Sequence, residues 1–374
     1  MMKKILFLTG TRADFGKIKP LISILESHRD FEVYIFVTGM HLLEEYGYTL
    51  IEIQRCQYGN LHTFYNHTHE STMDLTLAKT IEGLSAYVKE CNPDMIVIHG
   101  DRVEALAGAI VGSLNNILVA HIEGGEVSGT IDELIRHATS KMSHVHFVSN
   151  NLAKTRLIQM GELSESVFTI GSPDVDVMFS KNLPDFQTAK DYYAIPFENY
   201  AIAMFHPVTT EAKDMVKHAD IFVDTLLADH RNYVVIYPNN DLGSTAILKA
   251  YERLEDNPRF RVFPSLRFEY FLTLLKKATF IIGNSSAGIR EAPYYGLPVI
   301  NIGTRQQNRS LHADIIHTDY TTVGIATALA QVALVPINPS KPDFGTGNSA
   351  QLFLDSLKNT DIWQLNHQKQ FRDI

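Results

Sequence analysis

Residues 95–121 read MIVIHGDRVEALAGAIVGSLNNILVAH, and this stretch indicates how the chain folds. Met95–His99 is an apolar run that predicts a buried strand, and Ile117–His121 predicts a second one. Between them, Ala105–Ser113 is rich in small residues and predicts a helix. A strand, a helix and another strand in this order build a parallel sheet with helices on its faces. The sequence therefore predicts an α/β fold.

The same alternation continues on both sides of this stretch. Towards the N-terminus it predicts strands at 4–8 and 31–38 and helices near 17–28 and 73–90. Later strands are expected at 200–205, 233–237, 279–283 and 299–302. We therefore predict two doubly wound, Rossmann-like domains, residues 1–172 and 173–350, with the boundary at Gly171-Ser172-Pro173. Residues 351–374 are expected to form a C-terminal helical segment that packs back on the first domain.

The bulk composition excludes several classes of protein. Hydrophobic residues make up 45% of the chain and charged residues 20%, which is typical of a soluble globular protein. The net charge of −9 argues against a nucleic-acid partner. Cys56 and Cys91 lack metal-ligand spacing and are too few for a disulfide framework. No apolar run approaches the roughly 20 residues of a membrane span, and the N-terminal run is too short for a signal peptide. We expect a cytoplasmic protein with no membrane partner.

In doubly wound sheets, ligands bind beyond the carboxyl ends of the strands, and here the cleft between the two domains is the expected site. Asp101 and Arg102 directly follow the strand Met95–His99, which places them at such an end. The alternative role for Asp101 is to cap the helix that follows.

The segment His121–Glu133 reads HIEGGEVSGTIDE and packs four carboxylates and three glycines into one loop. Glycines let a loop approach a ligand closely. Carboxylates such as Glu123 and Asp132, close in sequence to the basic pair Arg136-His137, can be driven to different pKa values, as acid–base catalysis requires. A solvated loop with Asp132 as a helix cap is the alternative, and it accounts for only one of the carboxylates.

Two further segments could bind an anion through free backbone N–H groups at the start of a helix. One is the turn Gly10–Lys17, where Arg12 and Lys17 add positive charge. The other is Asn284–Pro293, which contains Ser285, Ser286 and Glu291. His206 follows a strand in the same half, although a lone histidine is often structural. The chain has no cysteine–histidine cluster, no Gly-x-Ser-x-Gly nucleophile motif and no dinucleotide fingerprint.

Together these segments resemble the hydrolysing UDP-N-acetylglucosamine 2-epimerases of bacterial sialic acid biosynthesis, over nearly the whole chain. The segments that carry the resemblance are TGTRADFGK (9–17), VTGMH (37–41), HGDRVE (99–104), HIEGGEVSGTID (121–132), RH (136–137), FHPVTT (205–210), NSSAGIREAP (284–293) and GTRQ (303–306). The related non-hydrolysing epimerases carry Gly-Thr-Arg-Pro-Glu and His-Val-Glu-Ala-Gly, where this chain has Gly-Thr-Arg-Ala-Asp and His-Ile-Glu-Gly-Gly. The hydrolysing group is the better match.

The resemblance implies a two-domain glycosyltransferase-B architecture, a reaction without cofactor or metal, and a homodimer or homotetramer. It implies loss of UDP to give 2-acetamidoglucal, then addition of water to give N-acetylmannosamine. The positions that match its catalytic groups are Asp101, Glu123, Asp132 and His206. The groups expected to bind the UDP-sugar are Arg12, Lys17, Arg102, Arg136, His137, Asn239, Ser285, Ser286, Glu291 and Arg305.

Several alternatives stay open at the level of the sequence. A hydrolysing epimerase acting on a UDP-2,4-diacetamido-6-deoxy sugar would share nearly all of these motifs. A non-hydrolysing epimerase and a glycosyltransferase of the same architecture are the next candidates, although a transferase would not need the carboxylate-rich loop. A non-catalytic nucleotide-sugar sensor would not need Asp101, Glu123 and Asp132. The motifs assign neither the step served by each carboxylate nor any regulation.

Overall fold

A computed structural model describes residues 2–67, 72–128, 130–306, 315–335 and 344–372. The chain divides into two compact units. Unit 1 comprises Met1–Glu126, Asp132–Ser180 and Asp343–Ile374, and unit 2 comprises Val127–Ile131 and Lys181–Pro342. The chain therefore leaves unit 1 and returns to it near its C-terminus. In the part of the chain that the structure describes, no helix is both long enough and apolar enough to cross a membrane.

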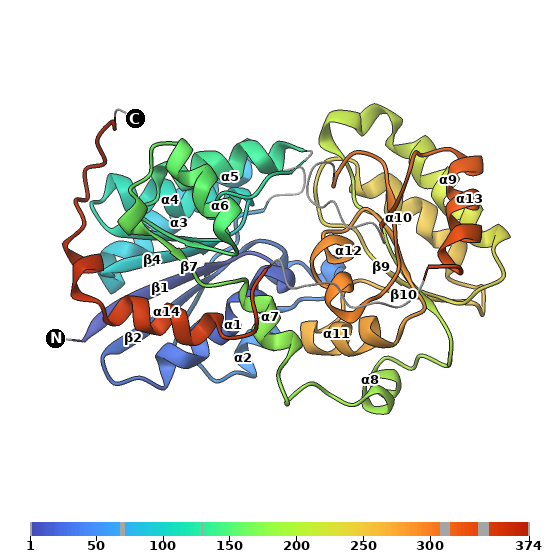
Figure 1. The fold of residues 1–374 in the computed structure, drawn as a ribbon, viewed down its shortest axis with the longest axis horizontal. Coiled ribbons are helices and arrows are strands. Elements are labelled where there is room, and N and C mark those ends of the chain that lie inside the picture. Colours follow the sequence, from blue (N-terminus) through green and yellow to red (C-terminus); the bar gives the residue numbers. More distant parts are fainter. Residues whose placement is uncertain (1, 68–71, 129, 307–314, 336–343, 373–374) are drawn as a thin grey trace. The chain divides into compact units, whose positions relative to one another are not determined.

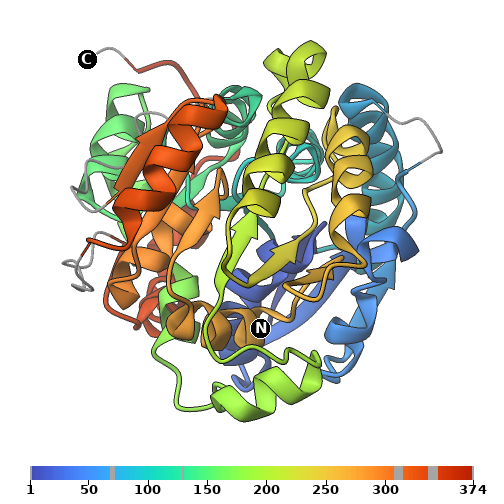
Figure 2. The same ribbon diagram turned by 90° about the vertical axis from the view of Figure 1, so that its right-hand side faces the viewer.

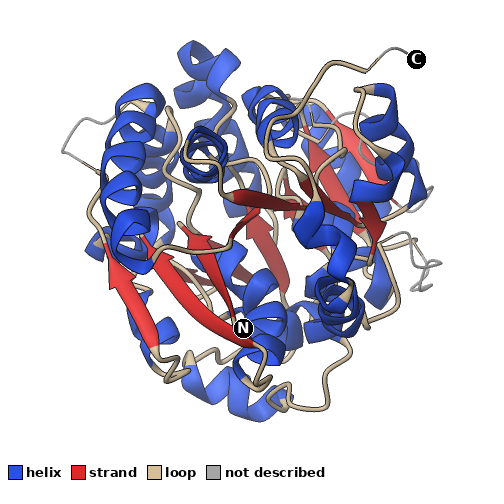
Figure 3. Ribbon diagram, turned by 90° about the vertical axis from the view of Figure 1, so that its left-hand side faces the viewer, coloured by secondary structure: helices blue, strands red, loops and turns tan. Residues whose placement is uncertain are grey.

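Unit 1 contains a parallel sheet of seven strands in the order β3-β2-β1-β4-β5-β6-β7 (Figure 1). The strands are β1 (Lys3–Thr9), β2 (Phe31–Val37), β3 (Asn60–Thr63), β4 (Met95–His99), β5 (Leu118–Ile122), β6 (Val145–Val148) and β7 (Val167–Thr169). The order reverses between β1 and β4, which is the switch point of a doubly wound sheet. Strands β1, β4 and β5 are almost wholly buried because helices cover both faces (Figure 3).

The helices of unit 1 are α1 (Arg12–Glu26), α2 (Leu50–Gln54), α3 (Met73–Cys91), α4 (Val103–Leu114), α5 (Ile131–Met142), α6 (Asn151–Gln159), α7 (Pro173–Met178) and α14 (Ser349–Lys358). One apolar core joins the sheet to α1 and α14 and includes Phe353 from the C-terminal segment. A second core, on the opposite face of the sheet, joins it to α3 and α4. Helix α14 packs against α1 and α7.

The first helix begins earlier than the sequence pattern predicts. We expected it near Lys17, but α1 starts at Arg12. The cause is a capping box, in which the Thr11 hydroxyl accepts from the Asp14 N–H and the Asp14 carboxylate accepts from the Thr11 N–H. These bonds satisfy backbone donors of the first turn, so the helix extends up to the end of β1.

Unit 2 contains a parallel sheet of six strands in the order β10-β9-β8-β11-β12-β13. The strands are β8 (Ala201–Met204), β9 (Tyr233–Ile236), β10 (Phe260–Phe263), β11 (Ile281–Gly283), β12 (Val299–Ile302) and β13 (Ile315–Thr318). The helices are α8 (Phe186–Tyr192), α9 (Met215–Ala228), α10 (Ser244–Tyr251), α11 (Phe268–Lys277), α12 (Ala287–Arg290) and α13 (Thr322–Val332). On one face of the sheet, α9 packs between α10 and α13 (Figure 2). The predicted class, two doubly wound α/β units, is confirmed.

The segment after α14 returns along unit 1 and is held by hydrogen bonds of residues 367–369. His144 and His367 contact each other through the His144 ring nitrogen Nε2 and the His367 carbonyl, 3.0 Å apart. The Gln368 amide donates to Oδ1 of Asn116 over 2.6 Å. Lys369 donates to the backbone carbonyls of Lys141 and Ser143 at 2.9 and 2.6 Å.

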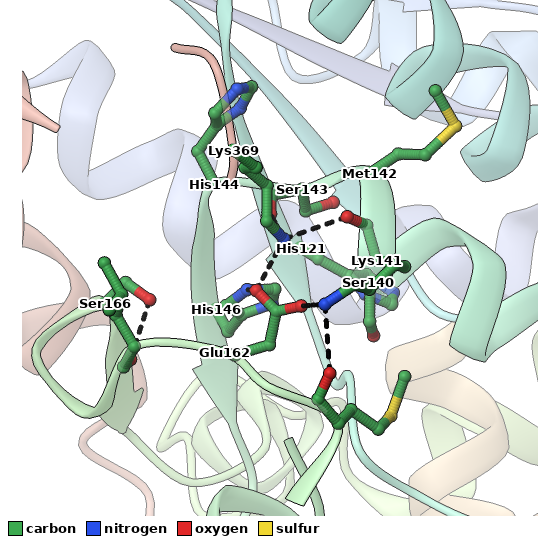
Figure 4. A network of polar contacts seen from close by, with 12 residues as sticks. His121, Ser140, Lys141, Met142, Ser143, His144, His146, Glu162, Ser166 and Lys369 are labelled. Carbon is green, nitrogen blue, oxygen red and sulfur yellow. Dashed lines mark hydrogen bonds and ion pairs between the residues drawn. The ribbon is translucent and has the colours of Figure 1, made fainter. Parts of the chain in front are cut away.

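Lys369 also completes a charge cluster around Glu162, whose side chain is only 2% exposed (Figure 4). His146 Nε2 lies 3.0 Å and Lys141 Nζ 3.1 Å from this carboxylate, and Lys369 Nζ lies 2.5 Å from it. Burial by itself would raise the pKa of Glu162, but His146 and Lys369 lower it to about 2. Burial lowers the pKa of Lys369 in turn, so the net stabilisation is smaller than the Glu162 shift alone suggests.

We expect Lys369→Ala to lower the free energy of unfolding by about 1–3 kcal/mol, because it removes a charged donor from a buried carboxylate and from two carbonyls. Urea unfolding followed by circular dichroism measures the change. Lys358→Ala, at an exposed position in the last turn of α14, is the matched control and should change stability by less than about 0.5 kcal/mol. Equal stability of the two variants would show that Lys369 does not anchor the C-terminal segment.

Candidate active site

Two of the predicted carboxylates lie at the carboxyl ends of neighbouring strands in unit 1. Asp101 follows β4 after the turn residue Gly100, whose φ is +76°. Glu123 directly follows β5, which pairs with β4. Asp101 does not cap the next helix, since the N-cap of α4 is Arg102. The strand-end position therefore brings both side chains to one edge of the sheet.

Arg136, on α5, connects these two strand ends. Its NH2 group pairs with Oδ2 of Asp101, and its NH1 group donates to the backbone carbonyl of Glu123 over 2.5 Å. The Arg136 side chain is 3% exposed, so the guanidinium is a buried charge with a carboxylate partner. The guanidinium therefore bridges the two strand ends, with one N–H group bound to each.

Glu123 has a left-handed backbone, with φ +64°, which is uncommon for a residue other than glycine. Backbone strain of this kind costs about 1–3 kcal/mol and persists only where surrounding bonds enforce it. Here the Glu123 N–H donates to the carbonyl of Phe147 over 2.8 Å, in addition to the Arg136 bond. The side chain is 3% exposed, and its Oε2 lies 3.2 Å from Nε2 of His99. Its Oε1 accepts a hydrogen bond from the Ser172 hydroxyl.

His121 lies in β5, two residues before Glu123, and is fully buried. It orients the turn at Asp101. Its Nε2 lies 2.7 Å from the Gly100 carbonyl, which can only accept, so the proton is on Nε2. Its Nδ1 then accepts from the hydroxyl of Ser140, 2.9 Å away. Burial lowers the pKa of His121 to about 3. His121 is therefore a neutral positioning residue.

The turn at Thr9–Asp14 is organised by its own carboxylate. The Asp14 side chain accepts from the N–H groups of Gly10 and Thr11, at 3.0 and 3.3 Å, and from the Thr9 hydroxyl. Thr9 Oγ1 also lies 3.0 Å from Nε2 of His41, whose pKa is lowered to about 3 by burial and by the charge of Arg12. Backbone donors that we assigned to a bound anion from the sequence are thus engaged with Asp14.

The remaining candidates of unit 1 are spread over several elements. Arg12 NH2 lies 3.7 Å from Oε1 of Glu52, and Lys17 Nζ lies 3.1 Å from Oδ2 of Asp174. Arg102 Nε donates to Oε2 of Glu104 over 3.3 Å.

Asp132 lies in the first turn of α5, one turn before Arg136, and it is not the helix cap. His137 Nε2 lies 3.4 Å from Oε1 of Glu133 on the same helix. Gly129, the last glycine of the carboxylate-rich loop, lies outside the described residues.

In unit 2, His206 is held at the carboxyl end of β8 by bonds to its backbone and ring. The Asn284 side chain accepts from the His206 N–H over 2.6 Å and donates to the His206 carbonyl over 2.8 Å. The Asn239 N–H donates to Nδ1 of His206 over 3.0 Å. Because Nδ1 is an acceptor, the neutral imidazole carries its proton on Nε2. His206 therefore presents an N–H donor at this edge of the sheet.

The neighbouring strand ends supply further polar groups. Arg305 and Gln306 follow β12 and both donate to the Asn284 carbonyl, over 3.4 and 2.9 Å. Ser285 Oγ accepts from the Ala287 N–H over 3.3 Å.

Ser286 is the N-cap of α12, and the Glu291 that ends this helix is 3% exposed. Strands β9, β8, β11 and β12 are consecutive in the sheet, so these groups share one edge.

The structure thus brings together Asp101, Glu123 and Arg136 in unit 1, and His206, Asn239 and Arg305 in unit 2. Our sequence reasoning missed three partners, which are His99, Ser172 and Asn284. Asn284 directly follows β11, so the strand-end rule could have identified it. Ser172 is 49 residues from Glu123 in sequence, and no local signal connects them.

Comparison with known proteins gives consistent matches over the chain. Residues 23–358 match the family model described as UDP-N-acetylglucosamine 2-epimerase. A Neisseria meningitidis UDP-N-acetylglucosamine 2-epimerase is 49% identical over 100% of both chains. A Legionella pneumophila UDP-N,N'-diacetylbacillosamine 2-epimerase (hydrolyzing) is 33% identical over 97% of both. The solved structure of the Methanocaldococcus jannaschii UDP-GlcNAc 2-epimerase with UDP-GlcNAc and UDP is 21% identical, with a TM-score of 0.82 over 95% of this chain and 99% of that one, which shows a common fold.

Two of the buried histidines of unit 1, His41 and His121, predict an acid-sensitive fold. In an unfolded chain the histidine pKa is about 6.5, whereas burial lowers it to about 3 in His41 and His121. Between these pH values the unfolded state binds a proton that the folded state does not. We therefore expect the free energy of unfolding to fall as pH is lowered, by about 1.4 kcal/mol per pH unit for each histidine.

Urea unfolding between pH 7.5 and 4.5 measures this slope. His41→Gln should reduce the slope of unfolding free energy against pH by about 1.4 kcal/mol per pH unit, the contribution of one histidine. This holds even though the variant is less stable at every pH. His230→Gln, at an exposed position, should leave the slope unchanged. A His41→Gln slope equal to that of the wild type would contradict the neutral state of His41.

Proposed function

We propose that this chain, which belongs to the UDP-N-acetylglucosamine 2-epimerase family, is a hydrolysing member that converts UDP-N-acetylglucosamine and water to N-acetylmannosamine and UDP. The reaction would be the first step of sialic acid biosynthesis. The observation that carries the proposal is the cluster of Asp101, Arg136 and Glu123 at the strand ends of unit 1. It combines two carboxylates with a buried cation, as acid–base chemistry on a sugar requires.

Two lines of support favour the hydrolysing reaction. The loop segments Gly10–Asp14 and His121–Gly125 carry the residues of the hydrolysing group where the two groups differ. The Legionella relative, aligned over 97% of the chain, is also named as a hydrolysing enzyme. Both point to release of a free sugar, and a direct assay of the products decides between the two reactions.

The proposed reaction has two stages. In the first, a carboxylate removes the proton from C2 of the sugar while the bond from C1 to the UDP oxygen breaks, which gives 2-acetamidoglucal and UDP. In the second, the hydroxyl of water adds to C1 and a proton adds to C2. This proton arrives on the face opposite to the one from which the first proton was removed, so C2 is inverted. We propose Asp101, Glu123 and Asp132 as the acid–base groups, since Asp101 and Glu123 follow neighbouring strands and Asp132 lies one helical turn before Arg136, which binds both of them.

Groups of unit 2 suit the departing nucleotide. The C2 proton is weakly acidic, so departure of UDP must be assisted by stabilising the negative charge on its phosphates. His206 carries its proton on Nε2 and is held in place by Asn284 and Asn239, which makes it a pre-oriented donor for an anion. We propose Arg305, Ser285 and Ser286 as further phosphate contacts, and Glu291 as a partner of the ribose hydroxyls.

A second substrate has specific support. The Legionella relative is named for a UDP-diacetylbacillosamine, a 2,4-diacetamido sugar nucleotide. The same two-stage chemistry at C1 and C2 would serve this sugar, because its additional substituent is at C4. We therefore propose it as the alternative substrate if UDP-N-acetylglucosamine is not consumed.

The test of the function is proton NMR of the purified protein with UDP-N-acetylglucosamine in D2O. We expect UDP and free N-acetylmannosamine that carries deuterium at C2. Intact UDP-N-acetylmannosamine would establish the non-hydrolysing reaction instead. If the nucleotide sugar is unchanged, the same experiment with the 2,4-diacetamido nucleotide tests the alternative.

We expect Asp101→Asn, Glu123→Gln and Asp132→Asn each to reduce kcat by about 100-fold or more, because each removes a group that exchanges protons with the sugar. Steady-state release of UDP measures kcat, and calorimetric titration measures UDP affinity, which should persist. Normal turnover in all three variants would refute their catalytic assignment.

The matched comparison is in unit 2, where Ser285→Ala and Glu291→Ala should weaken UDP binding before they affect kcat. If neither variant changes UDP affinity, the nucleotide is bound by other groups.

A further inference from the structure

We propose that Ser172 is a positioning residue that holds the carboxylate of Glu123 in one orientation and favours its ionised form during the acid–base steps. The reaction it serves is the proposed function, on which this inference rests. From the sequence, Gly171-Ser172-Pro173 reads only as a domain boundary. The structure gives Ser172 a specific partner in unit 1.

The Ser172 hydroxyl donates to Glu123 and does not cap its own helix. Ser172 is the N-cap of α7, where a serine hydroxyl ordinarily accepts a hydrogen bond from the first turn of its helix. In α7 the N-cap side chain makes no such bond, and the hydroxyl donates to Oε1 of Glu123. The N–H of Val175, at the third helical position, donates to the Ser172 backbone carbonyl over 3.0 Å and not to its hydroxyl. The hydroxyl therefore bonds to Glu123 and does not cap α7.

The backbone around Ser172 is fixed by a close approach of two chain segments. Gly171 has φ +83°, and a Cβ there would lie 3.0 Å from the Cα of Gly345. Gly345 has φ +109°, and its Cβ would lie 2.7 Å from the Cα of Gly171. The Ser172 N–H donates to the carbonyl of Phe344 over 2.6 Å. The segment that leaves unit 1 and the one that returns to it are therefore in contact beside Ser172, which is 0% exposed.

The surroundings of Glu123 make the charge state of its carboxyl group sensitive to the hydrogen bond from Ser172. Its carboxylate faces Ser172 at one oxygen and His99 Nε2, 3.2 Å away, at the other. The charged Arg136 binds its carbonyl, and Asp101 pairs with Arg136. A hydrogen bond from a hydroxyl to a buried carboxylate stabilises the charged form. Loss of the bond should therefore make Glu123 take up a proton at higher pH.

The experiment compares Ser172→Ala with Ser172→Thr, which keeps the hydroxyl, and with Ser166→Ala as the matched control. Ser166 is also buried in unit 1, at 3% exposed, but its hydroxyl donates to the Leu163 carbonyl, 2.8 Å away. For Ser172→Ala we expect kcat at pH 6 to fall about 10-fold or more, with the acid limb of the kcat–pH profile moved to higher pH. KM and UDP affinity should stay near the wild-type values. Ser172→Thr should restore the acid limb, and Ser166→Ala should match the wild type.

A wild-type kcat–pH profile in Ser172→Ala would overturn the inference. Equal losses of kcat at every pH in Ser172→Ala and Ser172→Thr would also overturn it, since they indicate a purely structural role. Absence of wild-type turnover on both nucleotide sugars would contradict the proposed function instead. In that case a carbon-13 titration of the glutamate carboxyls, assigned with Glu123→Gln, decides the role of Ser172 without turnover. The Glu123 resonance should titrate at higher pH in Ser172→Ala, and an unchanged titration would reject the proposal.

Discussion

The buried guanidinium of Arg136 links the residues that follow β4 and β5, and the candidate site of unit 1 depends on it. A buried cation is tolerated only with charged and polar partners, which here are the Asp101 carboxylate and the Glu123 carbonyl. The carbonyl bond also helps to keep Glu123 in its left-handed conformation, which directs the side chain towards His99 and Ser172. Arg136 thus contributes to the position of Asp101, to the strained backbone of Glu123 and to the charge of the site.

In unit 2 the candidate histidine is held in position by neutral groups. Asn284 bridges both backbone groups of His206, and the Asn239 N–H fixes which ring nitrogen carries the proton. An amide can both donate and accept, so it satisfies two backbone groups at once without adding charge. In both units a side chain from one strand end or helix binds the backbone of another strand end. This arrangement sets the geometry of the reactive groups before any ligand binds, as efficient catalysis requires.

How far the sequence predicts this structure depends on burial and on distance along the chain. Inner strands such as β1 and β4 are apolar and were predicted. The predictions missed β3, β7, β10 and β13, which are the edges of the two sheets, together with β6. An edge strand such as Asn60–Thr63 is only half-buried, so its sequence lacks the apolar run on which the prediction relied. Likewise Asp101 and Glu123 follow from the strand-end rule, whereas Ser172 requires tertiary structure.

The histidines show why residue type alone does not assign a role. His121 donates its one ring N–H to the Gly100 carbonyl, and burial keeps the ring neutral. It therefore cannot exchange this proton without breaking the turn at Asp101. His206 accepts from a backbone N–H at Nδ1, which places its proton on Nε2. Both residues lie at the carboxyl ends of strands and look equivalent in sequence. The partner of each ring nitrogen, which only the fold supplies, separates the histidine that builds the site from the one that is suited to act in it.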